Sequence, residues 1–368
     1  MSGARVTENC RFCWMCRHVC PVGHVTARET LTPHAWALTI ESVTRGQLEW
    51  NSETAEVMYA CADCGLCRSH CVTDQPLPDA ITAARAEIVR LGVAPSVVTD
   101  IDRRLRDQAG SLPAASSVAP ARTGAVALFA GDTGGDRRAS VDAAIALLHA
   151  SGIEVVEIGR ARSSGLLASS LGLTETAQIL ARSVIEEVEA SGAHDLFVLS
   201  PADRWTFEYV YPRRLGLQSP AIAVHEITDV LARALANGQL TLESRDEGEP
   251  YAYHDPCHGP RVAEGQSDQS NRPAPQALLA AAIGTTGARE LFWRGHRAHP
   301  CGATGGLEFT HPDIARRLAD ARLDDCERSG ARVLVTEDPA CLTHLRAQGS
   351  GRVTVTGLYE LLAQRLRP

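Results

Sequence analysis

Eight of the twelve cysteines in this 368-residue chain lie within its first 71 residues, in two runs of identical spacing. The first run is Cys10-x2-Cys13-x2-Cys16-x3-Cys20-Pro21, and the second is Cys61-x2-Cys64-x2-Cys67-x3-Cys71. Three thiolates separated by two residues can wrap one face of a metal–sulfur cube. Soft thiolate ligands also suit iron in a tetrahedral sulfur shell. The runs therefore predict two [4Fe-4S] clusters.

The fourth cysteine of each run is expected to bind the cluster of the other run, as in two-cluster bacterial-type ferredoxins. The first cluster is then predicted to bind Cys10, Cys13, Cys16 and Cys71. The second is predicted to bind Cys61, Cys64, Cys67 and Cys20. Crossed ligation packs the two runs together, so the clusters are expected to lie close enough to exchange electrons. Val72 stands where a proline often follows the last cysteine, but that position shapes the chain and is not a ligand.

Two structural zinc sites are the alternative, because paired cysteines also bind zinc. A zinc site requires neither the third cysteine of each run nor the fourth, which follows after three residues. The spacing therefore favours iron–sulfur clusters over zinc. Three histidines near the runs could donate hydrogen bonds that tune a cluster, although each alone is better explained as a polar surface residue. They are His18, His24 and His70.

Composition and charge exclude several other classes of protein. The 36 basic residues are all arginine and are outnumbered by 44 acidic residues, giving a net charge of −8, which argues against nucleic-acid binding. No apolar stretch is long enough to predict a membrane span, and the first ten residues lack the apolar region of a signal peptide. We therefore expect a cytoplasmic protein, whose cysteines serve metal or redox chemistry rather than disulfides.

Residues 1–93 are predicted to form a helical domain that positions the two cysteine runs. Helical spacing of apolar residues extends over 33–48, a Ser/Glu-rich start opens a helix over 52–59, and Pro78 opens another that ends at Gly92. Residues 94–123 are predicted to be a helix followed by a linker, because their last part is rich in serine, proline and small residues.

From residue 124 onward short apolar runs alternate with helical stretches, which is typical of a parallel sheet with helices between its strands. Residues 191–205 align without a gap with 329–343, and Gly131-Asp132 after the first strand corresponds to Pro256-Cys257. This internal similarity predicts a duplication. The fold class expected is α + α/β, an α-helical ferredoxin domain followed by two Rossmann-like α/β lobes that face each other. The lobes are predicted at 124–240 and 251–368.

The forty residues between Cys20 and Cys61 are helical in pattern and unusually many for a small ferredoxin. This part resembles the α-helical ferredoxin domain of succinate dehydrogenase iron–sulfur subunits and heterodisulfide reductase subunits. With two repeats after it, the chain resembles iron–sulfur subunits of the heterodisulfide reductase, glycolate oxidase and anaerobic glycerol-3-phosphate dehydrogenase group. Their cysteine-rich CCG-type repeats carry a lone Cys, then Cys-Cys-Gly, then Cys-Pro-x-Cys.

The second repeat keeps part of that pattern, with Cys257 in HDPCHGPR, Cys301 in HPCGATGG and Cys341 in EDPACLTH. Pro300 and Asp338 replace the two missing cysteines. In the first repeat all five positions have changed, to Asp132, Ser163, Ser164, Ser200 and Asp203.

The three cysteines that survive predict a third metal site, holding an iron–sulfur cluster or zinc. Its fourth ligand would be Asp338, His299 or an external group, and the alternative is a remnant without metal. Cys326 lies in a helical pattern and is expected to be a packing or surface thiol.

The resemblance implies an electron-transfer subunit rather than an enzyme, and no nucleophile–base pair stands out. Such a subunit takes electrons from a partner flavoprotein that carries FAD or FMN, either a dehydrogenase or an N-demethylase. It passes them to a downstream carrier within a hetero-oligomer. The alternative is an enzyme that reduces a heterodisulfide, another disulfide or a quinone at the Cys257, Cys301 and Cys341 site. A redox sensor is disfavoured, because no DNA-binding motif is present.

Overall fold

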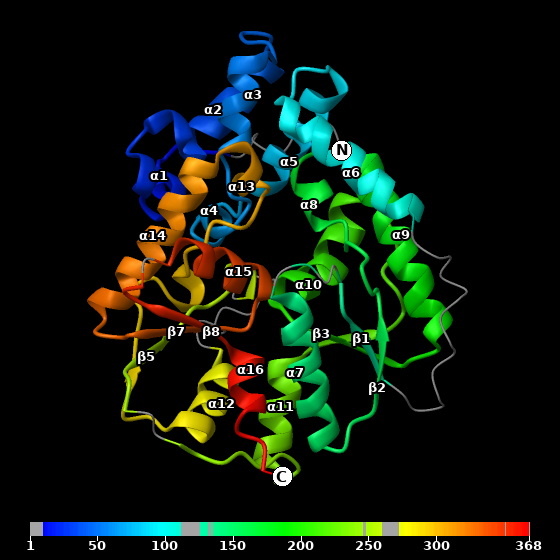
Figure 1. The fold of residues 1–368 in the computed structure, drawn as a ribbon. Helices are drawn as coiled ribbons and strands as arrows, with labels where there is room; N and C mark the ends of the chain where they lie inside the picture. Colours follow the sequence, from blue (N-terminus) through cyan, green and yellow to red (C-terminus); the bar gives the residue numbers. More distant parts are fainter. Residues whose placement is uncertain are drawn as a thin grey trace.

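The structure is a computed structural model that describes residues 10–111, 126–131, 134, 136–245, 248–259, 272–349 and 351–367. It combines helices at the N-terminal end with two four-stranded parallel sheets, which confirms the expected mixture of helical and α/β structure (Figure 1). Of the helices described, none has the length and apolar character needed to cross a bilayer.

The N-terminal part is built from short helices around the two cysteine runs. They are η2 (Met15–Val19), α1 (Pro21–Thr26), η3 (Glu29–Leu31), α2 (Pro33–Thr44), α3 (Ser52–Tyr59), α4 (Leu66–Ser69), α5 (Leu77–Arg90) and α6 (Ser96–Ser111). Helix α3 has the predicted bounds, because Asn51 and Thr54 form a capping box at its start. Helix α2 ends earlier than predicted, and Gly46 turns the chain just beyond it with φ +69°.

The first sheet has the strand order β2-β1-β3-β4, with all strands parallel. Its elements are β1 (Val126–Phe129), α7 (Arg137–Ala150), β2 (Val155–Ile158), α8 (Leu166–Ser170), α9 (Thr174–Ser191), β3 (Asp195–Val198), α10 (Pro201–Trp205), η5 (Thr206–Arg214), β4 (Ala223–Glu226) and α11 (Ile227–Ala236). The segment η5 is a π-helix that contains Pro212. The end of the predicted linker, residues 112–123, lies outside the described residues.

The second sheet repeats that order as β6-β5-β7-β8, again with parallel strands. Its elements are β5 (Tyr251–Tyr253), α12 (Pro273–Ile283), β6 (Ala288–Arg289), η7 (Gly295–Arg297), α13 (Leu307–Thr310), α14 (Pro312–Arg328), β7 (Val333–Thr336), α15 (Pro339–Gln348), β8 (Thr354–Gly357) and α16 (Leu358–Ala363). Each sheet therefore brings the carboxyl ends of its two central strands, β1 with β3 or β5 with β7, side by side.

The two sheet-bearing parts share a core. Helices α7 and α11 of the first pack against α16 and α12 of the second, and Figure 1 shows these four helices together at the foot of the molecule. Leu147, Leu231, Leu278 and Leu362 from the four helices are buried in one apolar cluster. Such burial is the main favourable term in folding, so this contact holds the two parts as one body.

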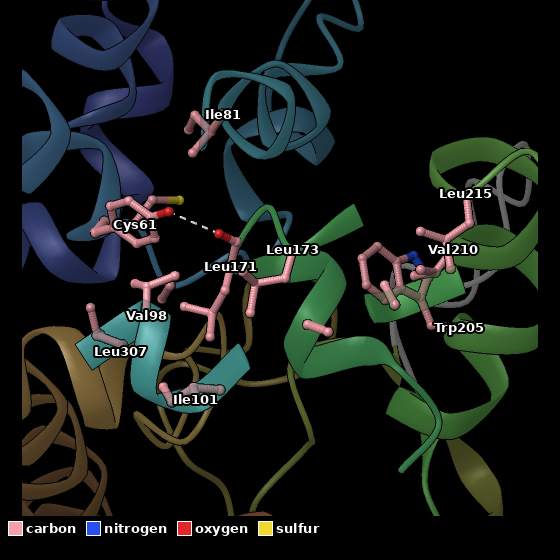
Figure 2. Close-up of a cluster of buried hydrophobic side chains, with 14 of the residues drawn as sticks. Cys61, Ile81, Val98, Ile101, Leu171, Leu173, Trp205, Val210, Leu215 and Leu307 are labelled. Atoms are coloured by element: carbon pink, nitrogen blue, oxygen red, sulfur yellow. Dashed lines mark hydrogen bonds between the residues drawn. The ribbon is translucent and has the colours of Figure 1, made fainter. Parts of the chain in front are cut away.

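A second core joins the N-terminal helices to the first sheet's helices. Figure 2 shows Val98 and Ile101 of α6 gathered with Leu171 and with Leu307 of α13. The Tyr59 hydroxyl donates a hydrogen bond of 2.9 Å to the carbonyl of Leu171 within this cluster. The cysteine runs are thereby held against both sheet-bearing parts.

Candidate metal centres

The first group of thiols is the set expected for the first cluster. Cys10, Cys13, Cys16 and Cys71 line one small cavity of about 40 Å³. Burial, followed by repulsion from Cys10, raises the pKa of Cys16 to about 11, and Cys71 contributes to the same rise. The last cysteine of the second run therefore lies with the first three of the first run.

The second group is the complementary set, Cys20, Cys61, Cys64 and Cys67, which lines a separate cavity of about 20 Å³. Burial raises the pKa of Cys61 to about 12, although the nearby Arg85 opposes the rise. Burial, and then repulsion from Cys61, also raises the pKa of Cys67 well above its ordinary value. In the protein alone the thiols of Cys61 and Cys67 are protonated at neutral pH, so binding iron must release their protons.

Both runs bend the chain at equivalent places. The residues on either side of the middle cysteine have positive φ in each run: Phe12 (47°) and Trp14 (66°) in the first, Asp63 (48°) and Gly65 (76°) in the second. A non-glycine residue in this region costs about 1–2 kcal/mol. The turn allows the Asp63 N–H to face the Cys61 sulfur at 3.3 Å. Strain repeated at matched positions indicates loops shaped to present thiols inward.

These observations fit two [4Fe-4S] clusters. Each group offers four thiols around its own cavity, which matches the donor set of a cubane. Cys67 lines both cavities. Repulsion from Cys16 of the first group contributes to the raised pKa of Cys67. The two groups are therefore neighbours.

A third candidate site lies where the two sheet-bearing parts face each other. Residues that follow the strands of both sheets line one cavity of about 260 Å³. The second repeat contributes Cys257, Cys301, Asp338 and Cys341, and the first contributes the matched positions Ser163, Ser164, Ser200 and Asp203. Asp132, the remaining matched position, lies outside the described residues.

Two cysteines of this site are in contact, and a histidine joins them. The sulfur atoms of Cys301 and Cys341 are 3.0 Å apart. A ring nitrogen of His254 and these two sulfurs all lie within 4.8 Å of one another. Burial, and then the charge of Arg322, lowers the pKa of His254 to about 3, so the imidazole is neutral and can act as a ligand. Sequence reasoning missed His254, although the spacing His254-x2-Cys257 is a possible metal-binding signal.

The other residues expected at this site have different surroundings. Asp338 caps α15, and its Oδ1 accepts hydrogen bonds from the N–H groups of Ala340 (2.9 Å) and Cys341 (3.0 Å). His299 stacks on Trp293 with 3.9 Å between ring centroids. Cys257 lines the cavity and lies close enough to Cys341 to raise its pKa, but it lies outside the 4.8 Å group.

Of the remaining predicted residues, Cys326 is a buried packing thiol in the core beside β7. Near the runs, the His24 ring nitrogen lies 2.9 Å from the His18 carbonyl. The ring of His70 stacks on that of His296 at 6.0 Å.

The second thiol group and the third site are neighbours. Cys64 and Cys257 are buried in the same small cluster. The ring of His258 bridges the second cysteine run and Cys257. Its Nε2 lies 3.2 Å from the Asp63 carbonyl, and its Nδ1 lies 4.0 Å from the Cys257 sulfur. Arg214 of η5 holds the carboxylate of Asp63 with two hydrogen bonds of 2.7 and 2.9 Å.

Comparison with known families identifies the class to which these sites belong. Residues 6–74 match the 4Fe-4S dicluster domain, and residues 251–346 match the Cysteine-rich domain. The chain is therefore an iron–sulfur protein that combines these two domains, and the resemblance predicted from its cysteine motifs is confirmed.

Individual relatives agree with this class. One subunit of the dihydromethanophenazine:CoB--CoM heterodisulfide reductase of Methanosarcina acetivorans is 23% identical over 335 residues, covering 85% of this chain and 79% of that protein. The corresponding protein of Methanosarcina barkeri is 24% identical over 345 residues, covering 89% and 81%. The Glycolate oxidase iron-sulfur subunit of Escherichia coli is 36% identical over 66 residues, covering 18% and 16%. The chain is homologous to iron–sulfur subunits of multi-subunit oxidoreductases.

Proposed function

We propose that this protein is the electron-transfer subunit of an oxidoreductase complex. It passes electrons from a partner flavoprotein dehydrogenase or demethylase, carrying FAD or FMN, to another carrier through two [4Fe-4S] clusters. The observation that supports this best is the separation of the eight N-terminal thiols into two adjacent groups of four. The relatives named above are subunits of complexes, which supports a partner chain.

The clusters supply one-electron carriage, and the chain's residues determine where they sit. Ligation is crossed, with Cys71 completing the first group and Cys20 completing the second. Cys13 is exposed, so the first cluster lies where a partner can approach. The second cluster is enclosed, because Cys20, Cys61 and Cys64 are buried. Electrons therefore enter or leave at the first cluster.

The two sheet-bearing parts act as Rossmann-like lobes that form the docking platform of the complex. Cys257, Cys301 and Cys341 form a third metal site in the second lobe, with a donor set that suits an iron–sulfur cluster or zinc. A cytoplasmic location suits so many free thiols.

One observation favours a second candidate function, a disulfide- or quinone-reducing enzyme. The cavity of about 260 Å³ is bordered by three cysteines, and one of them, Cys257, shares a small buried cluster with Cys64 of the second thiol group. A small molecule in this cavity would lie beside an electron source. Catalysis would then take place at the Cys257, Cys301 and Cys341 site.

Anaerobic reconstitution followed by EPR of the dithionite-reduced protein tests the cluster proposal. We expect about eight irons per chain and the signal of two interacting S = ½ clusters. The EPR signal of Cys71→Ser should match that of Cys13→Ser, whereas Cys20→Ser should match Cys64→Ser. A match of Cys20→Ser with Cys13→Ser would show that ligation is not crossed. Zinc with no reducible signal would refute electron transfer altogether.

Serine variants at the C-terminal cysteines separate the two functions. Unchanged electron transfer with the purified partner in Cys257→Ser would show that the third site is a remnant that takes no part in electron transfer. Loss of all turnover with both N-terminal clusters intact by EPR would instead establish the enzyme.

A further inference from the structure

A cavity of about 700 Å³ lies where the N-terminal helices meet the first sheet-bearing part. Its apolar walls come from Ile40 and Val43 of α2, Trp50 before α3 and Leu215 after η5. Cavities of this size with mostly apolar walls and a few polar groups are typical of small-molecule sites. No cysteine is among the described residues that line it, so it is separate from the three thiol groups. The small side chains of α5 that widen it are Ala80, Ala83, Ala84 and Ala86.

The charged groups around this cavity leave one positive charge without a partner. The charged residues that line it are Asp79, Glu87, Arg90, Arg213 and Arg214. The Arg214 Nε donates a hydrogen bond of 2.7 Å to Asp79. The Arg90 Nε donates one of 2.9 Å to Glu87. Arg213 is exposed, and within the described part of the chain its guanidinium has neither an ion pair nor a hydrogen bond. The cavity is therefore suited to a negatively charged group.

Ser169 of α8 brings an unpaired hydroxyl to the same cavity. The residue lines the cavity but is only 2% exposed. Its Oγ has no hydrogen-bond partner among the described residues. Alanine would fill nearly the same space without leaving a buried polar atom unpaired, and helices favour alanine. A hydroxyl at this position is explained by an acceptor atom of a molecule in the cavity.

We infer that this cavity binds a small carboxylate that carries an apolar body. Arg213 pairs with the carboxylate, because a guanidinium can donate two parallel hydrogen bonds to its oxygens. Ser169 donates a hydrogen bond to an oxygen of the ligand. The apolar body packs against α2 and Trp50, where its surface is removed from water.

This site goes beyond the proposed electron transfer, and its ligand is neither a metal nor an electron carrier. The predicted cluster ligands and the third site line other cavities, so the inference depends on a different set of residues. Arg214 lines the new cavity and also holds the carboxylate of Asp63 in the second cysteine run. The bound carboxylate would therefore lie one side chain away from that run.

Isothermal titration calorimetry of the full-length, reconstituted protein with octanoate tests the inference. One octanoate should bind per chain, and 1-octanol, which lacks the charge, should bind at least about tenfold more weakly. Arg213→Met should also weaken octanoate binding by at least about tenfold, whereas Arg213→Lys should restore part of it. The matched control is Arg182→Met, because Arg182 of α9 is also exposed but does not line the cavity. Its affinity for octanoate should equal that of wild type.

Two further variants probe the cavity itself. Ala83→Trp fills it from an exposed position of α5 and should abolish binding. Ser169→Ala should weaken octanoate binding by at least about threefold. This variant removes an unpaired buried hydroxyl, so it should not lower the stability of the ligand-free protein.

Several outcomes would overturn the inference. These are no saturable octanoate binding to wild type, equal binding of 1-octanol, or unchanged affinity in Arg213→Met. An equal loss of affinity in Arg182→Met would show binding through overall charge rather than in this cavity. Should Ala83→Trp fail to fold, Arg213→Met still decides, because Arg213 is exposed. Octanoate binding is measured without a partner, so a chain that binds octanoate but holds no iron would refute only the proposed function.

Discussion

Arg85 of α5 connects the second cysteine run to both repeats, and its loss is expected to destabilise the whole molecule. Its side chain is 0% exposed. The guanidinium donates five hydrogen bonds of 2.6–3.1 Å, and all of the acceptors are main-chain carbonyls. These acceptors belong to Met58, Cys61, Ser170 and Gly305.

The cost of Arg85→Met follows from those four carbonyls. Methionine retains most of the apolar length of the side chain, so the packing loss is small. Each buried carbonyl left without a donor costs about 1–3 kcal/mol. At the lower end of that range the four together cost about 4 kcal/mol, a large share of the roughly 5–15 kcal/mol that stabilises a typical protein.

Anaerobic urea titration followed by circular dichroism measures this effect. Arg90→Met is the matched control, because Arg90 lies on the same helix with a 66% exposed side chain and, among the described residues, pairs with Glu87 alone at the surface. The control should change the free energy of unfolding by less than about 1 kcal/mol. If the two variants unfold at the same urea concentration, the hydrogen bonds of Arg85 do not stabilise the fold as reasoned.

Two further substitutions test the contacts around the second thiol group, and a third tests a buried carboxyl group that lines the cavity of the third site. Gly305→Ala should cost at least ~2 kcal/mol by urea titration, because φ is +69° and a Cβ would come within 2.7 Å of the main chain of the second run. Arg214→Met should cost about 3–5 kcal/mol, since it leaves the buried carboxylate of Asp63 without its cation. The exposed neighbour Arg213→Met should show little change. Burial raises the pKa of Glu308 to about 7 from 4.5, so the fold favours its protonated form. The loss of stability from pH 5.5 to 8 should therefore be about 2 kcal/mol larger in wild type than in Glu308→Gln, in which the raised pKa of Glu226 still acts.

Local sequence signals predicted the elements of the fold well. The helix over 52–59 was predictable because its cap and its first turn are adjacent in sequence. Strand β1 lies within the apolar run that predicted it. The π-helix η5 had no such signal, because Pro212 within it normally ends a helix. Its conformation depends instead on buried partners such as the ion pair between Arg214 and Asp63.

The candidate sites also differ in how much of each could be predicted from local sequence. The spacing of the eight cysteines predicted two groups of four, because three ligands of each group are local in sequence. His254 could not be chosen by spacing alone, since Cys301 and Cys341 approach it only after the sheet has formed. The parallel pairing of β5 with β7 brings the end of the first strand beside the start of α15.

The contrast between the repeats explains why one of them is expected to hold metal. In the first repeat two residues at matched cysteine positions satisfy each other: the Ser200 hydroxyl lies 3.2 Å from the Asp203 carboxylate, and Arg137 pairs with that carboxylate at 2.8 Å. In the second repeat the thiols of Cys301 and Cys341 contact each other, but the Nε2 of the nearby His254 has no hydrogen-bond partner among the described residues. The first repeat can therefore keep its fold without an ion, whereas the second retains donors that an ion would satisfy.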